Sequence, residues 1–449
     1  MPKLLRRLGV RDAALIVMGG IVGSGIFRNP SVVAKFVPNG TLIMLTWTLG
    51  GAIALLGGAI FAELAARRPH DGGLYAYMRD AFHPALAFTY GWTLLLVSQS
   101  GGMAAAAVTF AGYVAPWIAA PLPGWEVERI LGVGAIAFFT LINAMGVRTG
   151  ANAQNGFMLL KILAIGGFIA VGFFAPHAAA VAAAPVSPSG NAIAAMGLAM
   201  VPVLFAYSGW QTSSFMSAEL VAPEKTLPRG MLIGVLCVVG LYLAVNAVSL
   251  LALGVSNLAA TNAPATDIAK LAFGAPGAWI MTVVVALSTL GFVSNQILTS
   301  PRVYFQMASD GVFFRQLAWV HVRTRAPVLA IVLQGTFGTV IALSGAYDQI
   351  LNYVTSVDYV FFGLSAIALI VFRQRDERDG APRPFYVLPG HPWTTLLFLI
   401  VAWGIVGDVL IKSPVATCIG IGILLSGLPV YALFARRRPS PPTVEESAT

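Results

Sequence analysis

The most regular feature of this chain is the alternation of long apolar runs with short segments that contain charged residues, prolines or glycines. A transmembrane helix needs about 20 consecutive, mostly apolar residues to cross the hydrocarbon layer of a bilayer. Because lipid offers no partner for an open backbone, runs of this length are expected to be helices. The pattern predicts twelve spans, at residues 12–36, 40–66, 84–115, 128–147, 152–175, 191–217, 228–254, 276–308, 327–345, 349–372, 393–411 and 414–435.

Composition restricts the solvent in which the chain can fold. Of its 449 residues, 57% are hydrophobic and 10% are Asp, Glu, Lys or Arg, whereas soluble domains carry about 25% charged residues. The mean hydropathy is +0.81, and one soluble core could not bury that much apolar surface. We therefore expect an all-α membrane protein with twelve transmembrane helices.

The basic residues are distributed unevenly between the two sides of this layout. The formal net charge is +9, but the Lys and Arg residues lie in short loops beside apolar runs, which favours a role in topology over nucleic-acid binding. Of 27 basic residues, 21 fall on the side of the N-terminus and 5 on the other side, with Lys161 inside the fifth run. This asymmetry predicts cytoplasmic N- and C-termini in a bacterial inner membrane. The basic N-terminus is expected to lead into a retained first span, not a cleaved signal peptide.

Two of the predicted spans are interrupted at mid-depth by residues that weaken a helix. The first contains GSG at residues 23–25, and the sixth contains AYSGW at residues 206–210. Glycine inside a helix costs about 1 kcal/mol relative to alanine, and irregular backbone at membrane depth is tolerated where it lines a cavity. Close helix packing through small residues is the alternative. We prefer packing for the glycines of the second span, which are Gly50, Gly51, Gly57 and Gly58.

The interruptions occupy the same place in two successive sets of five spans. That arrangement is typical of inverted repeats whose substrate binds between discontinuous helices near the midplane. The chain is therefore interpreted as one transporter domain. Its parts would be a first five-helix repeat (1–175), a second inverted repeat (191–372), two further helices (393–435) and a disordered tail (439–449).

Several motifs in this order resemble the amino acid–polyamine–organocation superfamily of transporters. They are GGIVGSGIFRNPSVVA in the first span, PHDGGLYAYMRDAF after the second, FAYSGWQTSSFMSAEL and PEKTLPRG around the sixth, LTSPRVYFQMASDGVFF around the eighth, and PRPFYVLPGHP after the tenth. The resemblance spans residues 10–410. It implies a LeuT-like five-plus-five inverted repeat with two extra helices, and secondary active transport of amino acids by alternating access.

The two interruptions suit a zwitterionic substrate. The half-helix that begins after GSG would present unpaired N–H groups to a carboxylate, and freed carbonyls near Ile21, Val22 and residues 205–208 could accept from an ammonium. By resemblance, the first-span motif contacts the substrate backbone and Phe205 occupies the position of an aromatic gate. The predicted substrate-binding residues are Ile21, Gly23, Ser24, Gly25, Phe205, Ala206, Ser208, Gly209, Gln99, Asn295 and Asp358.

Lys161 lies near the middle of the fifth span, where a charge is costly unless it is paired. Snorkelling of its flexible stem to the interface is the alternative. In sodium-independent relatives, a lysine at this position places its ammonium where sodium-coupled members bind a cation. The resemblance therefore implies a coupling role for Lys161, which could hold span one against span eight or could titrate, and no sodium requirement.

Asp358 in the tenth span departs from the family pattern, which more often has an apolar or aromatic residue there. It could be hydrogen-bonded within the bundle, or it could face the substrate side chain. Polar residues of spans three and eight, including Gln99 and Asn295, could line the side-chain pocket or form interhelical hydrogen bonds. Glu63 and Glu219 lie near cytoplasmic helix ends and are expected to form ion pairs with arginines.

The favoured function is proton-coupled symport or exchange of neutral L-amino acids. Gln211 stands where some cation-exchanging relatives carry an acid, so a cationic amino acid or polyamine exchanger is the alternative, with Asp358 supplying the charge. A channel or a transporter-like receptor would be a different class, and no catalytic constellation favours an enzyme. We expect no cofactor and no metal. Animal L-type relatives use a cysteine in the loop between spans three and four to join an accessory glycoprotein, and residues 116–127 contain no cysteine, so no such disulfide-linked partner is expected. We expect a monomer or homodimer.

Overall fold

The computed structural model describes residues 4–23, 25–119, 121–176, 192–344 and 347–436, with only the backbone described for residues 347–356. Within these residues every regular element is a helix. The transmembrane helices and their parts are α1 (Val10–Ile21), α2 (Asn29–Phe36), α3 (Gly40–Arg67), α5 (Pro84–Thr93), α6 (Gln99–Val114), α7 (Gly124–Ala144), α8 (Val147–Phe174), α9 (Ala192–Tyr207), α10 (Pro223–Ala260), α12 (Pro276–Thr299), α13 (Pro301–Ser309), α14 (Val328–Ser344), α15 (Tyr347–Arg378), α16 (Trp393–Lys412) and α17 (Pro414–Ala435).

Twelve spans account for these helices, as the apolar pattern predicts. Ten helical stretches among the described residues are long and apolar enough to cross a membrane. The eleventh span is the interrupted first one, in which α1 and α2 flank the short 3₁₀ helix η1 (Gly25–Phe27), and the twelfth is the 17-residue α14. Two short helices that the pattern did not predict lie between spans, α4 (Leu74–Ala81) and α11 (Pro264–Phe273).

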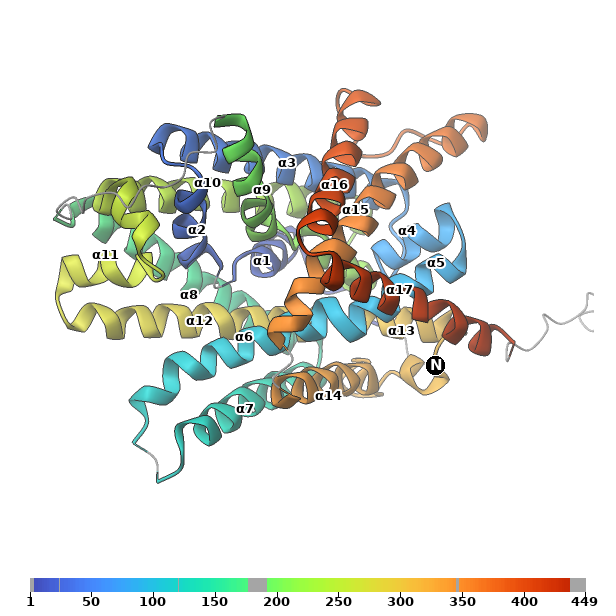
Figure 1. The fold of residues 1–449 in the computed structure, drawn as a ribbon. Coiled ribbons are helices and arrows are strands. Elements are labelled where there is room, and N and C mark those ends of the chain that lie inside the picture. The colour runs from blue at the N-terminus through green and yellow to red at the C-terminus, as the bar shows by residue number, and fades with distance from the viewer. Residues whose placement is uncertain (1–3, 24, 120, 177–191, 345–346, 437–449) are drawn as a thin grey trace, which may run out of the picture.

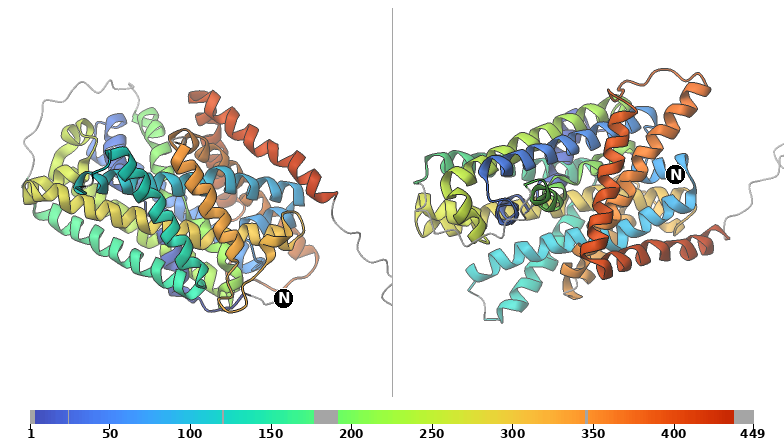
Figure 2. Two further views of the ribbon diagram at one scale, coloured as in Figure 1. Left: turned by 90° about the horizontal axis from the view of Figure 1, so that it is seen from below. Right: turned by 45° about the horizontal axis from the view of Figure 1, so that its top comes forward.

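The helices pack into one bundle with α1 at its centre (Figure 1). The helix α1 packs against α10, α8 and α12, and α10 also packs along α3. The last two helices, α16 and α17, lie on the outside against α15 and α5 (Figure 2). The N-terminus and the end of α17 lie at the same end of the bundle, which agrees with an even number of spans. We refer to this end as the inner end.

The glycines of α3 allow neighbouring helices to approach closely, so the packing interpretation of these residues is confirmed. A Cβ atom built on Gly50 would lie 2.3 Å from Val203 Cγ1 in α9. On Gly51 and Gly57 it would lie 2.8 Å from Val239 and 2.7 Å from Trp210, respectively. Contacts this short leave no room for a side chain, which explains why α3 carries so many glycines although it is an unbroken helix.

Candidate functional site

The first span loses its helical hydrogen bonding at the predicted motif. The helix α1 ends at Ile21, and Val22 is extended, with φ −77° and ψ 98°. The chain becomes helical again at Gly25, where η1 begins, and Ser24 between them lies outside the described residues. Helix ends leave backbone groups without intrahelical partners, so this interruption exposes polar backbone deep in an apolar bundle.

The sixth span is interrupted at the same depth, and the two interruptions touch. The helix α9 ends at Tyr207, and Gly209 has φ 115°, in the left-handed region that favours glycine. The 3₁₀ helix η4 (Trp210–Glu219) continues the span. A Cβ atom on Gly209 would lie 2.2 Å from the carbonyl oxygen of Gly20. Gly209 is therefore needed both for its backbone conformation and for the close crossing of the two spans.

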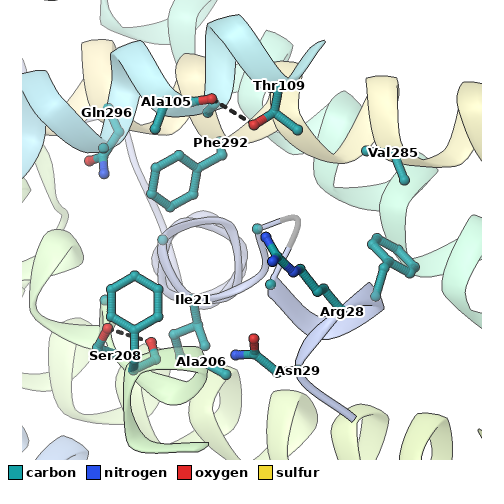
Figure 3. Close-up of a pocket in the computed structure, with 18 of the residues that line it drawn as sticks. Ile21, Arg28, Asn29, Ala105, Thr109, Ala206, Ser208, Val285, Phe292 and Gln296 are labelled. Carbon is teal, nitrogen blue, oxygen red and sulfur yellow. Dashed lines mark hydrogen bonds between the residues drawn. The ribbon is translucent and has the colours of Figure 1, made fainter. Parts of the chain in front are cut away.

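A cavity of about 440 Å³ lies beside these interruptions. Figure 3 shows side chains from the first, sixth and eighth spans converging on it. It extends away from the inner end as far as the loop before α11, where Asn262 and Ala263 line it. Nine predicted substrate-binding residues line this cavity: Ile21, Gly23, Gly25, Gln99, Phe205, Ala206, Ser208, Gly209 and Asp358.

The glycines of the first interruption face open space, in contrast to those of α3. The nearest atom to a Cβ built on Gly23 is Phe292 Cδ2 at 3.7 Å, and on Gly25 it is Asn29 Nδ2 at 3.6 Å. A side chain at either position would therefore fit against the protein and would occupy the cavity. Their small size leaves volume for a ligand close to the backbone.

The protein itself uses some of the carbonyls that were expected to be free. Tyr242 donates to the Ile21 carbonyl at 3.2 Å, Lys161 to the Val22 carbonyl at 2.6 Å and Ser288 to the Gly23 carbonyl at 3.1 Å. The carbonyls of both Ile21 and Val22, which were expected to be free, therefore each have a donor within the protein. At the other interruption the Ser208 hydroxyl donates to the Phe205 carbonyl at 2.7 Å.

Acceptors and donors without such partners remain on both sides of the cavity. Among the described residues, no hydrogen bond reaches the carbonyls of Ala206, in the last turn of α9, and Ser208, which follows this helix. The N–H groups of Gly25 and Ile26 begin η1 and likewise make no hydrogen bond within the described chain. Gly25, Ala206 and Ser208 line the cavity, so unpaired carbonyl oxygens lie on its α9 side and an unpaired N–H group lies on its η1 side, which is the polarity that a zwitterion requires.

Lys161 is buried behind the first interruption. Its side chain is 1% exposed and donates to the Val22 carbonyl. A Cβ atom on Gly291 of α12 would lie 2.6 Å from Lys161 Cε. The side chain therefore lies between α1 and α12, the first and eighth spans. Its ammonium stays at this depth and does not reach the membrane interface, so this geometry excludes snorkelling.

Asp358 is hydrogen-bonded within the bundle and also lines the cavity. Its Oδ1 accepts a hydrogen bond from the Ser98 hydroxyl at 2.7 Å, and the residue also lines the cavity. Ser98 ends a π-helical turn (Leu94–Ser98) between α5 and α6. Such turns are frequent at functional sites. No signal in the apolar pattern predicted this turn.

Asn295 does not line the cavity. Its side chain is fully buried and donates to the Ile16 carbonyl at 2.8 Å, so it forms the interhelical hydrogen bond that was its alternative role. The next residue, Gln296, lines the cavity instead, together with Phe292 one turn earlier. Consecutive helix positions differ by about 100°, and the prediction therefore identified the correct segment but the wrong face. Arg28, Asn29 and Thr109 also line the cavity and were not predicted.

Ion pairs and backbone contacts close the inner end. Arg302 of α13 donates to both carboxylate oxygens of Glu219 at 3.0 and 3.1 Å, and both side chains are buried. The N-terminal segment pairs with the same region, because Leu8 forms a parallel bridge with Leu220. Arg67 and Arg373 bind Glu63 at 2.7 and 2.6 Å. The predicted arginine partners of Glu63 and Glu219 are therefore confirmed.

A second group of ion pairs and hydrogen bonds connects α4 to the loop after α13. Arg79 binds Asp80 and Asp310, and the Tyr75 hydroxyl donates to Asp310 at 2.9 Å. Burial would raise the pKa of Asp80, but hydrogen bonds and charges from His70 and Arg79 lower it to about 2. Asp80 is therefore ionised at any physiological pH.

Comparisons with known proteins agree with this geometry. A family profile described as amino acid permease matches residues 8–434. Asc-type amino acid transporter 1 of Mus musculus is 31% identical over 448 residues, which cover 97% of this chain and 83% of the relative. Large neutral amino acids transporter small subunit 2 of Homo sapiens is 31% identical over 440 residues, with coverage of 96% and 80%. The serine/threonine exchanger SteT of Bacillus subtilis is 28% identical over 442 residues, with coverage of 97% and 98%.

Proposed function

This chain belongs to the amino acid permease family and is a multi-pass amino acid transporter with the family's LeuT-like helical fold. We propose that its substrates are small neutral L-amino acids. The observation that carries this proposal is the cavity between the two interrupted spans, with N–H groups on one side and carbonyls on the other. The names of the relatives, an Asc-type transporter, a large neutral amino acid transporter and a serine/threonine exchanger, support a neutral substrate.

The substrate would lie across the two interruptions. Its carboxylate would accept from the N–H groups of Gly25 and Ile26, and its ammonium would donate to the carbonyls of Ala206 and Ser208. The side chain would then extend toward Gln99, Phe292 and Asp358, which line the remaining wall. Phe205, which is 38% exposed in the cavity wall, would cover the substrate from the α9 side.

The closed inner end and the cavity that extends away from it support an outward-facing state. Alternating access would require the ion pairs of Glu219 and Glu63 to separate while the outer walls approach each other. We place both termini in the cytoplasm of a bacterial inner membrane and treat residues 1–175 and 191–372 as the two repeats. A single chain without an accessory subunit, as a monomer or homodimer, suffices for this cycle.

Lys161 supports a sodium-independent mechanism. Its ammonium occupies the space between the first and eighth spans and donates a hydrogen bond to the Val22 carbonyl. A sodium ion at the same place would meet like-charge repulsion at close range. We infer that a proton on Lys161 takes the place of sodium, and that its loss and return couple transport to the pH gradient.

The alternative of a cationic amino acid or polyamine exchanger has one observation in its favour. Asp358 lines the cavity and its described neighbours include no basic partner. However, Arg28 lines the same cavity, so the net charge of the described wall does not favour a cation. We therefore keep neutral amino acids as the proposed substrates.

Uptake into proteoliposomes tests the coupling directly. The purified chain should accumulate labelled L-serine when the outside is acidic, and replacing external potassium by sodium should not increase the rate. Accumulation that requires sodium, or that is unaffected by collapsing the pH gradient with an ionophore, would contradict the proposed coupling.

A further inference from the structure

Arg28 is the one basic residue among the described residues that line the cavity. In Figure 3 its side chain extends inward, between the end of α1 and the start of α2. Other basic residues near this outer end have different surroundings. Lys35 donates to Asn262 at 2.9 Å, and the Arg129 guanidinium lies 4.9 Å from the centre of the Trp125 ring.

The backbone places Arg28 on the same side of the chain as Gly25. The Arg28 N–H donates to the Gly25 carbonyl at 3.1 Å, which closes one 3₁₀ turn. Such a turn contains three residues, so positions i and i+3 lie above one another. Arg28 and Gly25 therefore lie on the same side of η1, and both line the cavity.

No carboxylate in the described part of the chain forms an ion pair with Arg28. The other charged residue of the described lining, Asp358, accepts from Ser98 in the wall formed by α6 and α15. A guanidinium remains charged at every physiological pH and offers N–H groups in a fork that matches a carboxylate. A cation without a partner inside a substrate cavity is complementary to an anionic group of the ligand.

We propose that Arg28 is a specificity-determining residue that binds the α-carboxylate of the substrate, so that the transporter requires a free carboxylate and rejects amines that lack one. This inference rests on the proposed amino acid site. The η1 N–H groups contact the carboxylate from one side, and the guanidinium contacts it from the outer side. A side-chain carboxylate is a poorer ligand for Arg28, because the side chain extends toward Asp358 and would meet its negative charge.

The consequence for selectivity is specific. Polyamines and amino acid amides are repelled by Arg28 and gain no carboxylate contact in return. Cationic amino acids keep the carboxylate contact and are not excluded by Arg28 alone. Arg28 therefore disfavours polyamine transport, which was one part of the alternative function.

Competition between L-serine and L-serinamide for counterflow of labelled L-serine in proteoliposomes tests this role. In the wild type, L-serine should compete at concentrations at least 100-fold lower than L-serinamide. In Arg28→Gln, the apparent affinity for L-serine should fall at least tenfold while the apparent affinity for L-serinamide does not fall. The ratio of the two affinities should therefore fall at least tenfold, or about 1.4 kcal/mol. Arg28→Lys keeps the charge but loses the fork, and its ratio should be intermediate.

The matched control is Lys270→Gln in α11, an exposed residue outside the cavity. It removes the same charge from the outer end and should leave the ratio unchanged. A smaller change than tenfold in Arg28→Gln, an equal change in Lys270→Gln, or loss of both ligands by a monodisperse Arg28→Gln protein would overturn the assignment. Failure of the wild type to bind L-serine would instead contradict the proposed function, before any variant is compared.

Discussion

Two ionisable side chains at mid-depth have different surroundings, and this difference separates their roles. Lys161 is 1% exposed and donates to a backbone carbonyl. Asp358 lines the cavity and accepts from a hydroxyl. A group that is sealed from the ligand can act on the conformation of the protein, whereas a group in the cavity wall can act on the ligand itself.

Replacement of Lys161 should uncouple transport from the proton gradient. Lys161→Ala removes the charge between α1 and α12, so accumulation driven by a pH gradient should be lost while counterflow without a gradient persists. The measurement is uptake of labelled L-serine with and without a gradient in the same proteoliposomes. Normal gradient-driven accumulation by the variant would show that Lys161 has a structural role only.

Replacement of Asp358 should distinguish neutral from cationic substrates. Asp358→Asn keeps the volume and the hydrogen-bonding capacity toward Ser98 but removes the charge. If the substrates are neutral, their affinity should change by less than about tenfold, or about 1.4 kcal/mol, as measured by competition binding. Binding of L-arginine or L-lysine to the wild type and its selective loss in the variant would favour the cationic alternative.

A side chain at Gly25 should block the site without unfolding the protein. The Cβ position is 3.6 Å from the nearest atom, so Gly25→Val fits against the protein but fills the volume next to the η1 N–H groups. Binding of L-serine should fall below detection while the protein remains monodisperse in detergent. Gly112→Val is the control, because Gly112 has no neighbour within 4 Å and does not line the cavity. Equal binding by the two variants would place the substrate elsewhere.

At the scale of elements, one buried ion pair connects the sixth and eighth spans at the inner end of the bundle. Glu219 ends η4, and Arg302 is the second residue of α13, in the inner part of the eighth span. Their side chains are 0% and 2% exposed. Removing one partner of a buried pair leaves an uncompensated charge, which typically costs 3–5 kcal/mol.

Loss of this pair should therefore destabilise the fold measurably. Glu219→Ala leaves Arg302 buried without its carboxylate, and we expect a clear drop in the melting temperature of the purified protein. The control is Asp408→Ala, which breaks the half-exposed pair with Lys412 one turn away in α16 and should cost less than about 1 kcal/mol. Equal shifts for both variants would mean that the Glu219–Arg302 pair contributes no more than a surface pair.

The sequence predicted the positions of the helices better than it predicted which face of each helix lines the cavity. Apolar runs report membrane depth directly, so the twelve spans and both interruptions could be located. The π-helical turn at Leu94–Ser98 and the short helices α4 and α11 could not, because they follow from tertiary packing and local hydrogen bonding. Asn295 was assigned to the cavity instead of Gln296 for the same reason, since both faces of α12 are buried and carry polar residues.

The ionisable residues show where sequence reasoning succeeds at the site. Placing a lysine or an aspartate at membrane depth has a high free-energy cost, so the sequence alone identified Lys161 and Asp358 as candidates. Arg28 was missed because it was counted only as one of the five basic residues on the outer side, where basic residues are ordinary. Only the 3₁₀ turn from Gly25 to Arg28 brings its side chain back into the cavity.

At the scale of the whole molecule, both ends of the described chain lie at the inner end of the bundle. The basic asymmetry predicts that this end faces the cytoplasm. The exposed native cysteines, Cys237 and Cys418, can be replaced by serine to provide a background for labelling. Ala260→Cys should then react with a membrane-impermeant maleimide applied to intact cells, and Ala381→Cys should react only after the membrane is opened. The reverse pattern would invert the topology.

The central claim is that the cavity between the interrupted first and sixth spans carries neutral amino acids. Counterflow tests it most directly, because only a carrier exchanges internal unlabelled substrate for external label without an energy source. Proteoliposomes loaded with L-serine should take up labelled L-serine in sodium-free buffer with saturable kinetics. External neutral amino acids should compete, and L-lysine and putrescine should not. Uptake that does not saturate, or that L-lysine or putrescine inhibits as strongly as L-serine does, would contradict the account.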